Sequence, residues 1–328
     1  MKVVITGGGG FLGLKLAQAL LARGKLASTA STQTDLSKLV LLDAAFPDTM
    51  PKDPRLELVK GDVSDAETLE RVLTPDTASI FHLAAVVSGA AEADYDLGDR
   101  VNLEGTRRLL ARARRCVKPP QLVFASSVAA FGGDLPPVLD DATTPTPQTS
   151  YGTQKVIGEY LITDMSRKGF IDGRALRLPT IVVRPGKPNA AASSFASGII
   201  REPLNGVVSE CPVADDTGVW LLSPKRVIEC FLHAHDLPAT AWGSTRVVNL
   251  PGITASVADM LEGMRRVAGD AVVGRVKFVP DARIQAIVKT WPSRLNTPRA
   301  VKMGFQADPD IETVIRDYIA DEKIAIVS

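Results

Sequence analysis

A tyrosine and a lysine four residues apart, Tyr151 and Lys155, have the types and the spacing that could transfer a proton. They open the segment Tyr151–Met165, whose apolar spacing predicts a helix, so the two side chains share one face. A tyrosine hydroxyl with its ordinary pKa near about 10 is a poor base at neutral pH. A neighbouring ammonium favours the phenolate and lowers that pKa, which lets Tyr151 take the proton of a substrate hydroxyl. Ser127 could hydrogen-bond the same substrate oxygen and fix its angle.

A glycine-rich turn near the start of the chain predicts a dinucleotide site. It lies between an apolar run, Lys2–Thr6, and a segment with helical spacing, Phe11–Arg23, and this strand–turn–helix context is what makes a glycine motif credible. Its glycines permit a sharp turn, close approach of a diphosphate to the backbone, and close packing of the helix on the strand. The helix amino end would offer N–H groups and a positive dipole to the phosphates. The motif is Thr6-Gly7-Gly8-Gly9-Gly10-Phe11-Leu12-Gly13, and the contacts are assigned to Gly7, Gly10, Phe11, Leu12 and Gly13.

An acidic residue, Asp43, ends the next apolar strand, Leu39–Leu42. A carboxylate there can accept hydrogen bonds from both hydroxyls of an adenosine ribose and would repel a 2′-phosphate, which favours NAD over NADP. The interval from Gly13 exceeds the usual spacing of about 20 residues. The polar segment Ala27–Ser37, which reads as a surface loop or hairpin, accounts for the excess.

The elements that must position these residues alternate between strand and helix. Apolar strands that alternate with helices are typical of a parallel sheet covered on both faces, so we expect a doubly wound α/β Rossmann fold with a smaller C-terminal α/β substrate lobe. We assign 1–183 plus 224–250 to the NAD-binding domain and 184–223 plus 251–328 to the lobe. Further strands are predicted at Leu56–Val59, Ser79–Leu83, Gln121–Ala125, Ala175–Val183, Arg246–Leu250 and Val276–Val279, and further helices after a cap at Ser64 and at Asn102–Cys116, Ile228–His235, Ala255–Val267 and Asp310–Ile319.

Composition narrows the function classes. The 328 residues are 45% hydrophobic and 23% charged with a net charge of +1, which indicates a globular core and no attraction to nucleic acid or an anionic membrane. No apolar run approaches the roughly 20 residues of a membrane helix, and the chain opens on a strand rather than a signal peptide. The three cysteines are far apart, and no carboxylate cluster accompanies His233 and His235, so no metal is expected. Cytoplasm is the expected compartment.

Taken together, these motifs and several others resemble the extended short-chain dehydrogenase/reductase family over the first ~185 residues. The resemblance implies NAD as cofactor. It also implies that Asp62 and Val63 flank the adenine, that Leu83–Ala85 line the ribose and diphosphate, and that His82 ends a strand without catalytic duty. The residues that carry the resemblance are Gly7–Gly13, Gly61-Asp62-Val63, His82-Leu83-Ala84-Ala85, Asn102, Ala125-Ser126-Ser127, Tyr151, Lys155 and Leu178-Pro179.

Within this family, the resemblance assigns further roles in binding the cofactor. Lys155 would also hold the nicotinamide ribose, and Ser126 could share the role of Ser127. Cofactor contacts therefore include Asn102, Ser126, Tyr151, Lys155 and Pro179. Family members form dimers through helices that correspond to Asn102–Cys116 and Tyr151–Met165, so a homodimer is expected.

Departures from the family's patterns bear on the reaction. Dehydratases place an acid pair after the catalytic hydroxyl, where this chain has Val128-Ala129. Epimerases commonly have Tyr-Gly where this chain has Phe131-Gly132, and their acidic segment is replaced by Ser223-Pro224-Lys225-Arg226. Other segments are similar to members that oxidise the C2 hydroxyl of a four-carbon sugar acid. These segments are Phe131-Gly132-Gly133, Arg184–Asn189, Ala192–Phe195 and Trp291–Arg294.

A small sugar acid needs hydroxyl contacts and one cation. Ser88, Ser127, Asn189 and Ser193 could bind its hydroxyls, and Arg184, Arg201 or Arg294 could pair with its carboxylate in a fork. A nucleotide-sugar epimerase with tightly held NAD is the first alternative, and it would give no net NADH. A non-enzymatic NAD sensor is the second alternative, and it would need neither Tyr151 nor Lys155.

Overall fold

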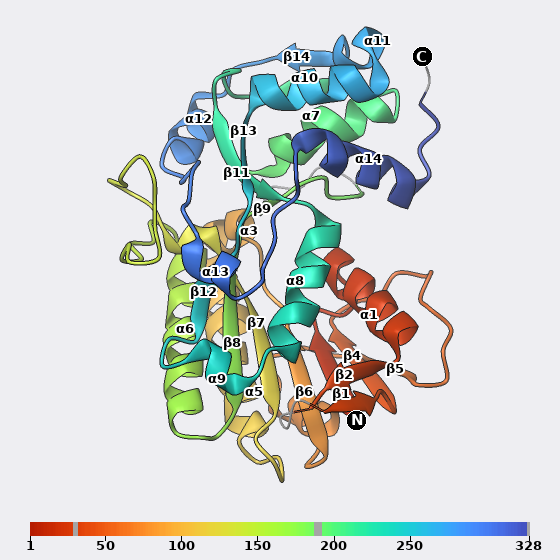
Figure 1. Cartoon of the computed structure of the whole chain (residues 1–328), viewed down its shortest axis with the longest axis vertical. Coiled ribbons are helices and arrows are strands. Elements are labelled where there is room, and N and C mark those ends of the chain that lie inside the picture. Colours follow the sequence, from red (N-terminus) through yellow and green to blue (C-terminus); the bar gives the residue numbers. More distant parts are fainter. Residues whose placement is uncertain (29–31, 187–191, 327–328) are drawn as a thin grey trace. The chain divides into compact units, whose positions relative to one another are not determined.

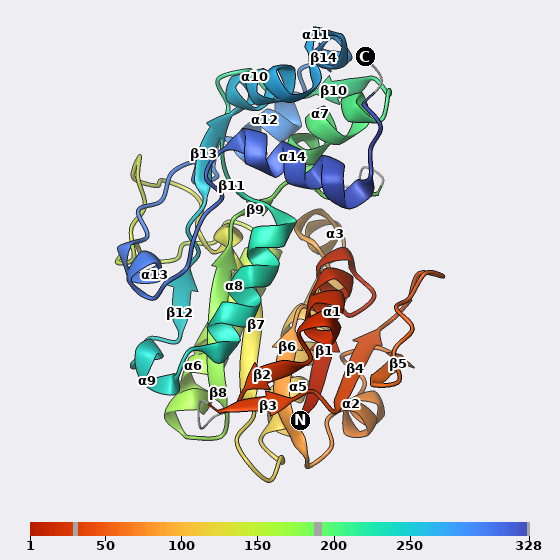
Figure 2. The ribbon, with the colours of Figure 1, turned by 45° about the vertical axis from the view of Figure 1, so that its right-hand side comes forward.

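The computed structural model describes residues 1–28, 32–186 and 192–326. The chain divides into two compact units. The first comprises Met1–Ala130, Thr149–Arg177 and Ile228–Val248, and the second comprises Phe131–Gln148, Leu178–Val227 and Asn249–Ser328. Figures 1 and 2 show the elements of each unit.

The first unit is built on a central sheet that has seven strands in the described part of the chain, in the order β12-β8-β7-β6-β1-β4-β5. Strand β1 pairs in parallel with β4 on one side and with β6 on the other, so the strand order reverses at β1. The carboxyl ends of β1, β4 and β6 therefore lie at one edge, where open parallel sheets bind ligands. The strands are β1 (Lys2–Thr6), β4 (Lys38–Asp43), β5 (Leu56–Lys60), β6 (Thr77–His82), β7 (Gln121–Ser127), β8 (Asp172–Leu178) and β12 (Val247–Asn249).

Helices cover both faces of this sheet, which confirms the predicted doubly wound α/β fold. Helices α1 (Phe11–Arg23) and α8 (Pro224–Asp236) lie on one face in Figures 1 and 2. On the other face, α2 (Ala66–Val72), α5 (Gly105–Ala113) and α6 (Ser150–Arg167) pack on buried residues of β1, β4, β6 and β7. Shorter elements are α3 (Ser88–Ala93), α4 (Tyr95–Gly98), the π-helix η1 (Asp99–Glu104), the 3₁₀ turn η2 (Val128–Ala130) and α9 (Ala239–Trp242). The polar insertion forms a hairpin of β2 (Lys25–Ala27) and β3 (Gln33–Asp35).

Two local predictions in the first unit are wrong. Ser64 does not cap a helix, because its hydroxyl and its N–H both donate to Asp62 at 2.8 Å, and Asp65 caps α2 instead by accepting from Thr68 N. The predicted strand Ala175–Val183 is interrupted at Pro179, which has no N–H to donate. Beyond that proline, β9 (Thr180–Ile181) pairs with a strand of the second unit's own sheet.

The second unit contains more regular structure than the sequence predicted. One sheet has the order β13-β11-β9, with β11 at Gly218–Leu222 and β13 at Ile253–Ser256, and β10 (Ser209–Cys211) pairs with β14 (Val276–Phe278). Helix α10 (Val257–Ala268) begins at a capping box between Ser256 and Asp259. Its buried face packs in one core with α7 and α14. The helices are α7 (Ser194–Leu204), α10, α11 (Asp270–Val273), α12 (Ala282–Val288), α13 (Pro298–Lys302) and α14 (Ile311–Glu322).

The segment Phe131–Gln148 belongs to the second unit, whereas the sequence assigned it to the first domain. Its middle is hydrogen-bonded to a distant part of the chain. Leu139 N donates to Arg294 O at 3.0 Å, and Asn296 N donates to Leu139 O at 2.7 Å. A pairing between residues so far apart leaves no local pattern in the sequence.

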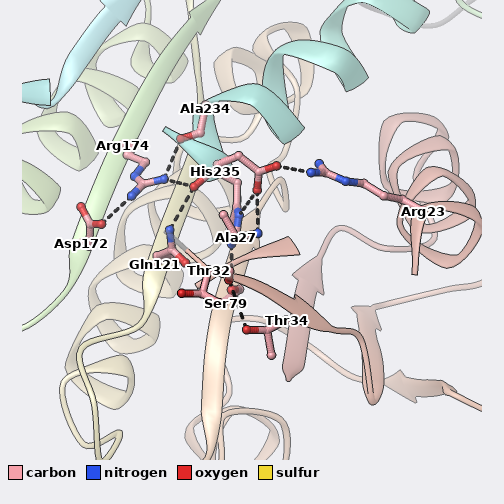
Figure 3. Close-up of polar contacts among 11 residues, drawn as sticks. Arg23, Ala27, Thr32, Thr34, Ser79, Gln121, Asp172, Arg174, Ala234 and His235 are labelled. Atoms are coloured by element: carbon pink, nitrogen blue, oxygen red, sulfur yellow. Dashed lines mark hydrogen bonds and ion pairs between the residues drawn. The ribbon is translucent and has the colours of Figure 1, made fainter. Parts of the chain in front are cut away.

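A buried polar cluster around His235 ties the end of α8 to the sheet (Figure 3). The His235 ring is 0% exposed, stacks on Phe81 and shares hydrogen bonds with Ser79 Oγ at 2.8 Å and Asp236 Oδ1 at 3.1 Å. Its backbone carbonyl accepts from Gln121 Nε2 at 3.0 Å and from the Arg174 guanidinium. These partners account for the burial of the polar His235 ring.

The free energy of unfolding is expected to fall as the pH drops from about 6.5 to about 4.5, because two histidines are buried in the neutral form. Burial, helped by the Lys155 charge, lowers the pKa of His82 to about 3, and burial also lowers the pKa of His235. Below pH about 6.5 the unfolded chain binds protons at both rings more readily than the folded chain, so His82 costs about 1.4 kcal/mol per pH unit and His235 adds to this slope. Urea unfolding at several pH values measures the slope.

A matched pair of variants tests this assignment. His235→Gln should reduce the slope. His233→Gln removes a partly buried histidine of the same helix and should change the slope less. An unaltered slope in His235→Gln would contradict the prediction.

Candidate active site

The glycine turn is packed too tightly for side chains at four of its five glycines, Gly7, Gly8, Gly9 and Gly13, and the first and last of these show why. An ideal Cβ on Gly13 would lie 2.1 Å from Gly7 O, so this glycine lets α1 begin directly against the end of β1. Gly7 has φ +73°, and a Cβ there would lie 2.7 Å from Ala84 N. The turn is therefore pressed against Ala84, just beyond the end of β6.

Gly10 differs from the other glycines of the turn because it faces open space. It is exposed, and a Cβ on it would meet Gly7 O at 3.3 Å as its one neighbour within 4 Å among the described residues. No described side chain caps α1 at Gly10, so the amino end of this helix keeps N–H groups for a ligand. An exposed helix amino end that begins at a glycine can offer its backbone N–H groups to a diphosphate.

Asp43 lies at the carboxyl end of β4 and is held in place by the glycine turn. Gly9 N donates to its Oδ2 at 2.9 Å, and Ala45 N donates to its Oδ1 at 3.3 Å. Each carboxylate oxygen has two lone pairs, so both retain capacity for ribose hydroxyls. The turn and this acid, predicted from separate motifs, are thus next to each other.

A chain of hydrogen bonds lies beneath the segment Leu83–Ala85. Thr106 Oγ1 donates to Asn102 O at 2.6 Å, so it accepts from His82 Nε2 at 2.9 Å. His82 Nδ1 is then the acceptor of Thr6 Oγ1 at 2.7 Å, and Ala84 N donates to Thr6 Oγ1 at 3.3 Å. His82 is thereby fixed as a neutral ring that supports the loop, in agreement with the prediction that it ends a strand.

The other residues predicted at the adenine and ribose lie after β5 and in η1. Asn102 is buried, and its amide exchanges hydrogen bonds with the backbone of Val86 at 2.8 and 3.0 Å. It therefore fixes the loop after β6. The Asp62 carboxylate accepts from Ser64 and pairs with Arg100, and Val63 is 6% exposed.

The proposed catalytic residues lie on β7 and α6 of the first unit. Thr149 caps α6 by accepting from Gly152 N at 3.1 Å, which places Tyr151 in the first turn. Lys155 is 3% exposed and donates to Ala125 O at 2.9 Å, and its ammonium lies 5.4 Å from the centre of the Tyr151 ring. Ser127 and Tyr151 are partly exposed. The structure therefore brings the buried ammonium beside the tyrosine, as the spacing predicts.

Burial shifts the titration of the lysine. Loss of solvation lowers the pKa of Lys155 to about 8, and the charge of Glu159 opposes that shift. The ammonium is still the majority form at neutral pH. It can therefore stabilise the Tyr151 phenolate there.

The residues predicted to bind the substrate differ in the element that carries them and in their exposure. Ser88 is partly exposed in the first turn of α3, and Ser193 precedes α7. Asn189 lies outside the described residues. Arg201 is 5% exposed, donates to Glu202 Oε1 at 2.5 and 3.1 Å and holds Arg184 O at 2.8 Å, which makes it a structural residue. Arg294 is exposed.

Two residues with a place at this site were not predicted from the sequence. Glu159 follows Lys155 by four residues in α6, and Arg177 lies on β8. The sequence pattern that could have indicated Glu159 is its helical spacing from Lys155, which puts a carboxylate on the same face one turn later. Across the described residues there is no group of three or more potential metal ligands. Nor does any described helix have the length and apolar character needed to span a membrane.

The chain belongs to the NAD-dependent epimerase/dehydratase family, whose model matches residues 3–237. This membership confirms the resemblance seen in the sequence and NAD as the cofactor, and the exposed glycine turn fits that cofactor. The chain is similar to the D-erythronate dehydrogenase of Cupriavidus necator, with 53% identity over 99% of this chain and 100% of that protein. It is also similar to the D-erythronate dehydrogenase of Haemophilus influenzae, with 44% identity over 97% of this chain and 99% of that protein.

A solved structure extends the similarity to the whole fold. The nucleoside-diphosphate-sugar epimerase from Agrobacterium tumefaciens has a TM-score of 0.93 and 37% identity to this chain. The match covers 100% of this chain and 96% of that one.

Proposed function

We propose that this protein oxidises the C2 hydroxyl of D-erythronate to 2-oxo-D-erythronate with NAD as the hydride acceptor. The observation that carries the proposal is the end-to-end similarity to two D-erythronate dehydrogenases. A buried lysine beside Tyr151 supports it, because this pair supplies the proton acceptor that an alcohol oxidation requires.

Each catalytic side chain has one task in this reaction. Ser127 donates a hydrogen bond to the C2 oxygen, and Tyr151, as phenolate, accepts the hydroxyl proton. Lys155 stabilises the phenolate with its charge and holds the nicotinamide ribose. NAD, when bound, would supply the acceptor for the hydride of C2, and the chain contributes position and charge.

Of the cofactor contacts proposed from the sequence, the glycine turn, Asp43 and Leu83–Ala85 stand at or just after the ends of β1, β4 and β6. Asp43 accepts from the adenosine ribose, and the amino end of α1 faces the diphosphate. We keep the first unit as the NAD-binding domain and the second as the substrate lobe. The full proposed set is Gly7, Gly10, Phe11, Leu12, Gly13, Asp43, Asp62, Val63, Leu83, Ala84, Ala85, Asn102, Ser126, Tyr151, Lys155 and Pro179.

The carboxylate of the substrate needs an arginine that can pair with it in a fork. Arg201 is bound to Glu202, and Arg184 and Arg294 remain the two other candidates named from the sequence. Replacing the binding arginine by Met should raise KM by about tenfold or more while kcat changes less, since a charged hydrogen bond contributes about 1.5–3 kcal/mol. Arg201→Met should instead lower the thermal midpoint. Steady-state kinetics measure the KM, and calorimetry measures the thermal midpoint. An unchanged KM in both Arg184→Met and Arg294→Met would contradict the assignment.

The protein is proposed to act as a homodimer in the cytoplasm. The exposed side chains of Ile157 and Tyr160 on α6 support a partner surface, at 36% and 67% exposure. Cys116, Cys211 and Cys230 form no disulfide with one another, which supports a reducing compartment. Sedimentation velocity would test the dimer, and a monomer at micromolar concentration would contradict it.

The function is tested by NADH formation with NAD and a panel of four- to six-carbon sugar acids, with D-erythronate first. Turnover of D-erythronate supports the proposal, and turnover of another acid only would change the substrate. The Agrobacterium tumefaciens structure favours a nucleotide-sugar epimerase as the second candidate. Tightly retained NAD, with no net NADH from any acid, would point to that candidate.

A further inference from the structure

A buried carboxylate lies one helical turn beyond Lys155. The Glu159 side chain is 3% exposed, and its Oε1 accepts from Ser126 Oγ at 2.5 Å and from Arg177 Nε at 2.9 Å. Its Oε2 accepts from Arg177 Nη2 at 2.7 Å. A buried carboxylate is tolerated only when it is paired and hydrogen-bonded, and both oxygens of Glu159 meet that condition.

This carboxylate reaches β7 at the residues that contact the catalytic groups. Ser126, which it binds, lies between Ala125, whose carbonyl accepts from Lys155 Nζ, and Ser127. A single side chain is thus connected to the strand that supports both Lys155 and Ser127.

Several charged and titratable groups surround the Lys155 ammonium. Glu159 and Tyr151 share its helix, Arg177 on β8 pairs with Glu159, and neutral His82 lies on β6. The Phe124 ring of β7 lies 4.7 Å from the ammonium. Among these groups, Glu159 is the carboxylate, and its charge opposes the loss of solvation.

We propose that Glu159 is a positioning residue for proton transfer, which holds Lys155 in the charged form and fixes the end of β7 through Ser126. Arg177 orients the carboxylate and weakens its field. The expected effect on turnover rests on the proposed function, because it requires Tyr151 to act as the base. The expected effect on the electrostatic potential at position 155 does not rest on that function.

Two charge-deleting variants should shift the proton equilibria in opposite directions. Glu159→Gln removes a negative charge, so a proton leaves the Tyr151–Lys155 pair more easily. In a plot of kcat/KM against pH, the pKa of the acid limb should fall by about one unit. The plateau of kcat/KM should fall about tenfold, because a smaller fraction of the protein then holds Tyr151 as phenolate together with Lys155 as ammonium. Arg177→Gln removes a positive charge and should move the limb up.

Two controls separate charge from packing. Asp164→Asn removes a carboxylate from the exposed face of the same helix and should change neither the limb nor the plateau. Ser126→Ala removes the hydrogen bond without removing a charge, so the acid limb should stay in place whatever happens to the rate.

A second readout needs no turnover. In Lys155→Cys, the pKa of the introduced thiol, followed by thiolate absorbance in the ultraviolet against the parent protein, reports the potential at this position. Adding Glu159→Gln should lower that pKa, and adding Arg177→Gln should raise it. Near-ultraviolet circular dichroism confirms that each variant is folded.

The outcomes separate the two proposals. Two results would overturn the positioning role and leave Glu159 as a packing residue. One is an unchanged thiol pKa in both double variants. The other is an acid limb of kcat/KM that does not shift in Glu159→Gln while the plateau falls. Absence of sugar-acid oxidation by the wild type would overturn the proposed function, and the thiol measurement would still decide the role of Glu159.

Discussion

Tyr151→Phe is expected to lower kcat for sugar-acid oxidation by about 10³-fold, because general base catalysis contributes about 10²–10⁴-fold. The ring stays and only the hydroxyl that accepts the proton is removed. The hydrogen bond from Lys155 to Ala125 O does not involve that hydroxyl. The dissociation constant of NAD should therefore change by less than about threefold, a free-energy change of about 0.65 kcal/mol.

Steady-state kinetics and NAD titration by fluorescence measure these two quantities separately. Tyr160→Phe is the matched control, because it removes the hydroxyl of an exposed tyrosine on the same helix. Full activity in Tyr151→Phe would revive the interpretation as a non-enzymatic NAD sensor.

Gly13→Ala is expected to destabilise the fold and abolish NAD binding. The added Cβ would lie 2.1 Å from Gly7 O and 2.8 Å from Gly8 Cα, so the helix must move away from the turn. Backbone atoms on both sides cannot yield as a flexible side chain does, and overpacking of this kind costs about 3 kcal/mol. Urea unfolding and NAD titration are the measurements.

Gly10→Ala provides the contrasting variant. A Cβ at this exposed position meets only Gly7 O at 3.3 Å among the described atoms, so the fold should lose less than about 1 kcal/mol. NAD binding should still weaken about tenfold or more, because the Cβ occupies the space proposed for the diphosphate. Equal NAD affinity in Gly10→Ala and the wild type would place the diphosphate elsewhere.

The parts of the site that follow from local patterns were predictable. The glycine turn, Asp43 and the Tyr151–Lys155 pair each depend on a few neighbouring residues and on the strand or helix that carries them. The structure shows the first two in contact, because parallel strands end at one edge. Their roles toward NAD and substrate stay predictions.

The parts that depend on competition or on distant partners were not predictable. The sequence predicted Ser64 as a helix cap, but its hydroxyl donates to Asp62, two residues earlier. Helix α7 was missed because its start, Ser194–Gly198, is rich in small residues that are also common in loops. The Glu159–Arg177 pair joins a helix to a strand 18 residues away, so only the fold brings it together.

The most direct test of the central claim follows the hydrogen on C2. D-erythronate carrying deuterium at C2 is incubated with NAD and the wild-type protein, and the NADH and the sugar acid are analysed by mass spectrometry. The account predicts one deuterium in the NADH and a 2-oxo acid that has lost it. NADH without deuterium would show that another carbon is oxidised, and deuterium retained on the sugar with no NADH would contradict oxidation altogether.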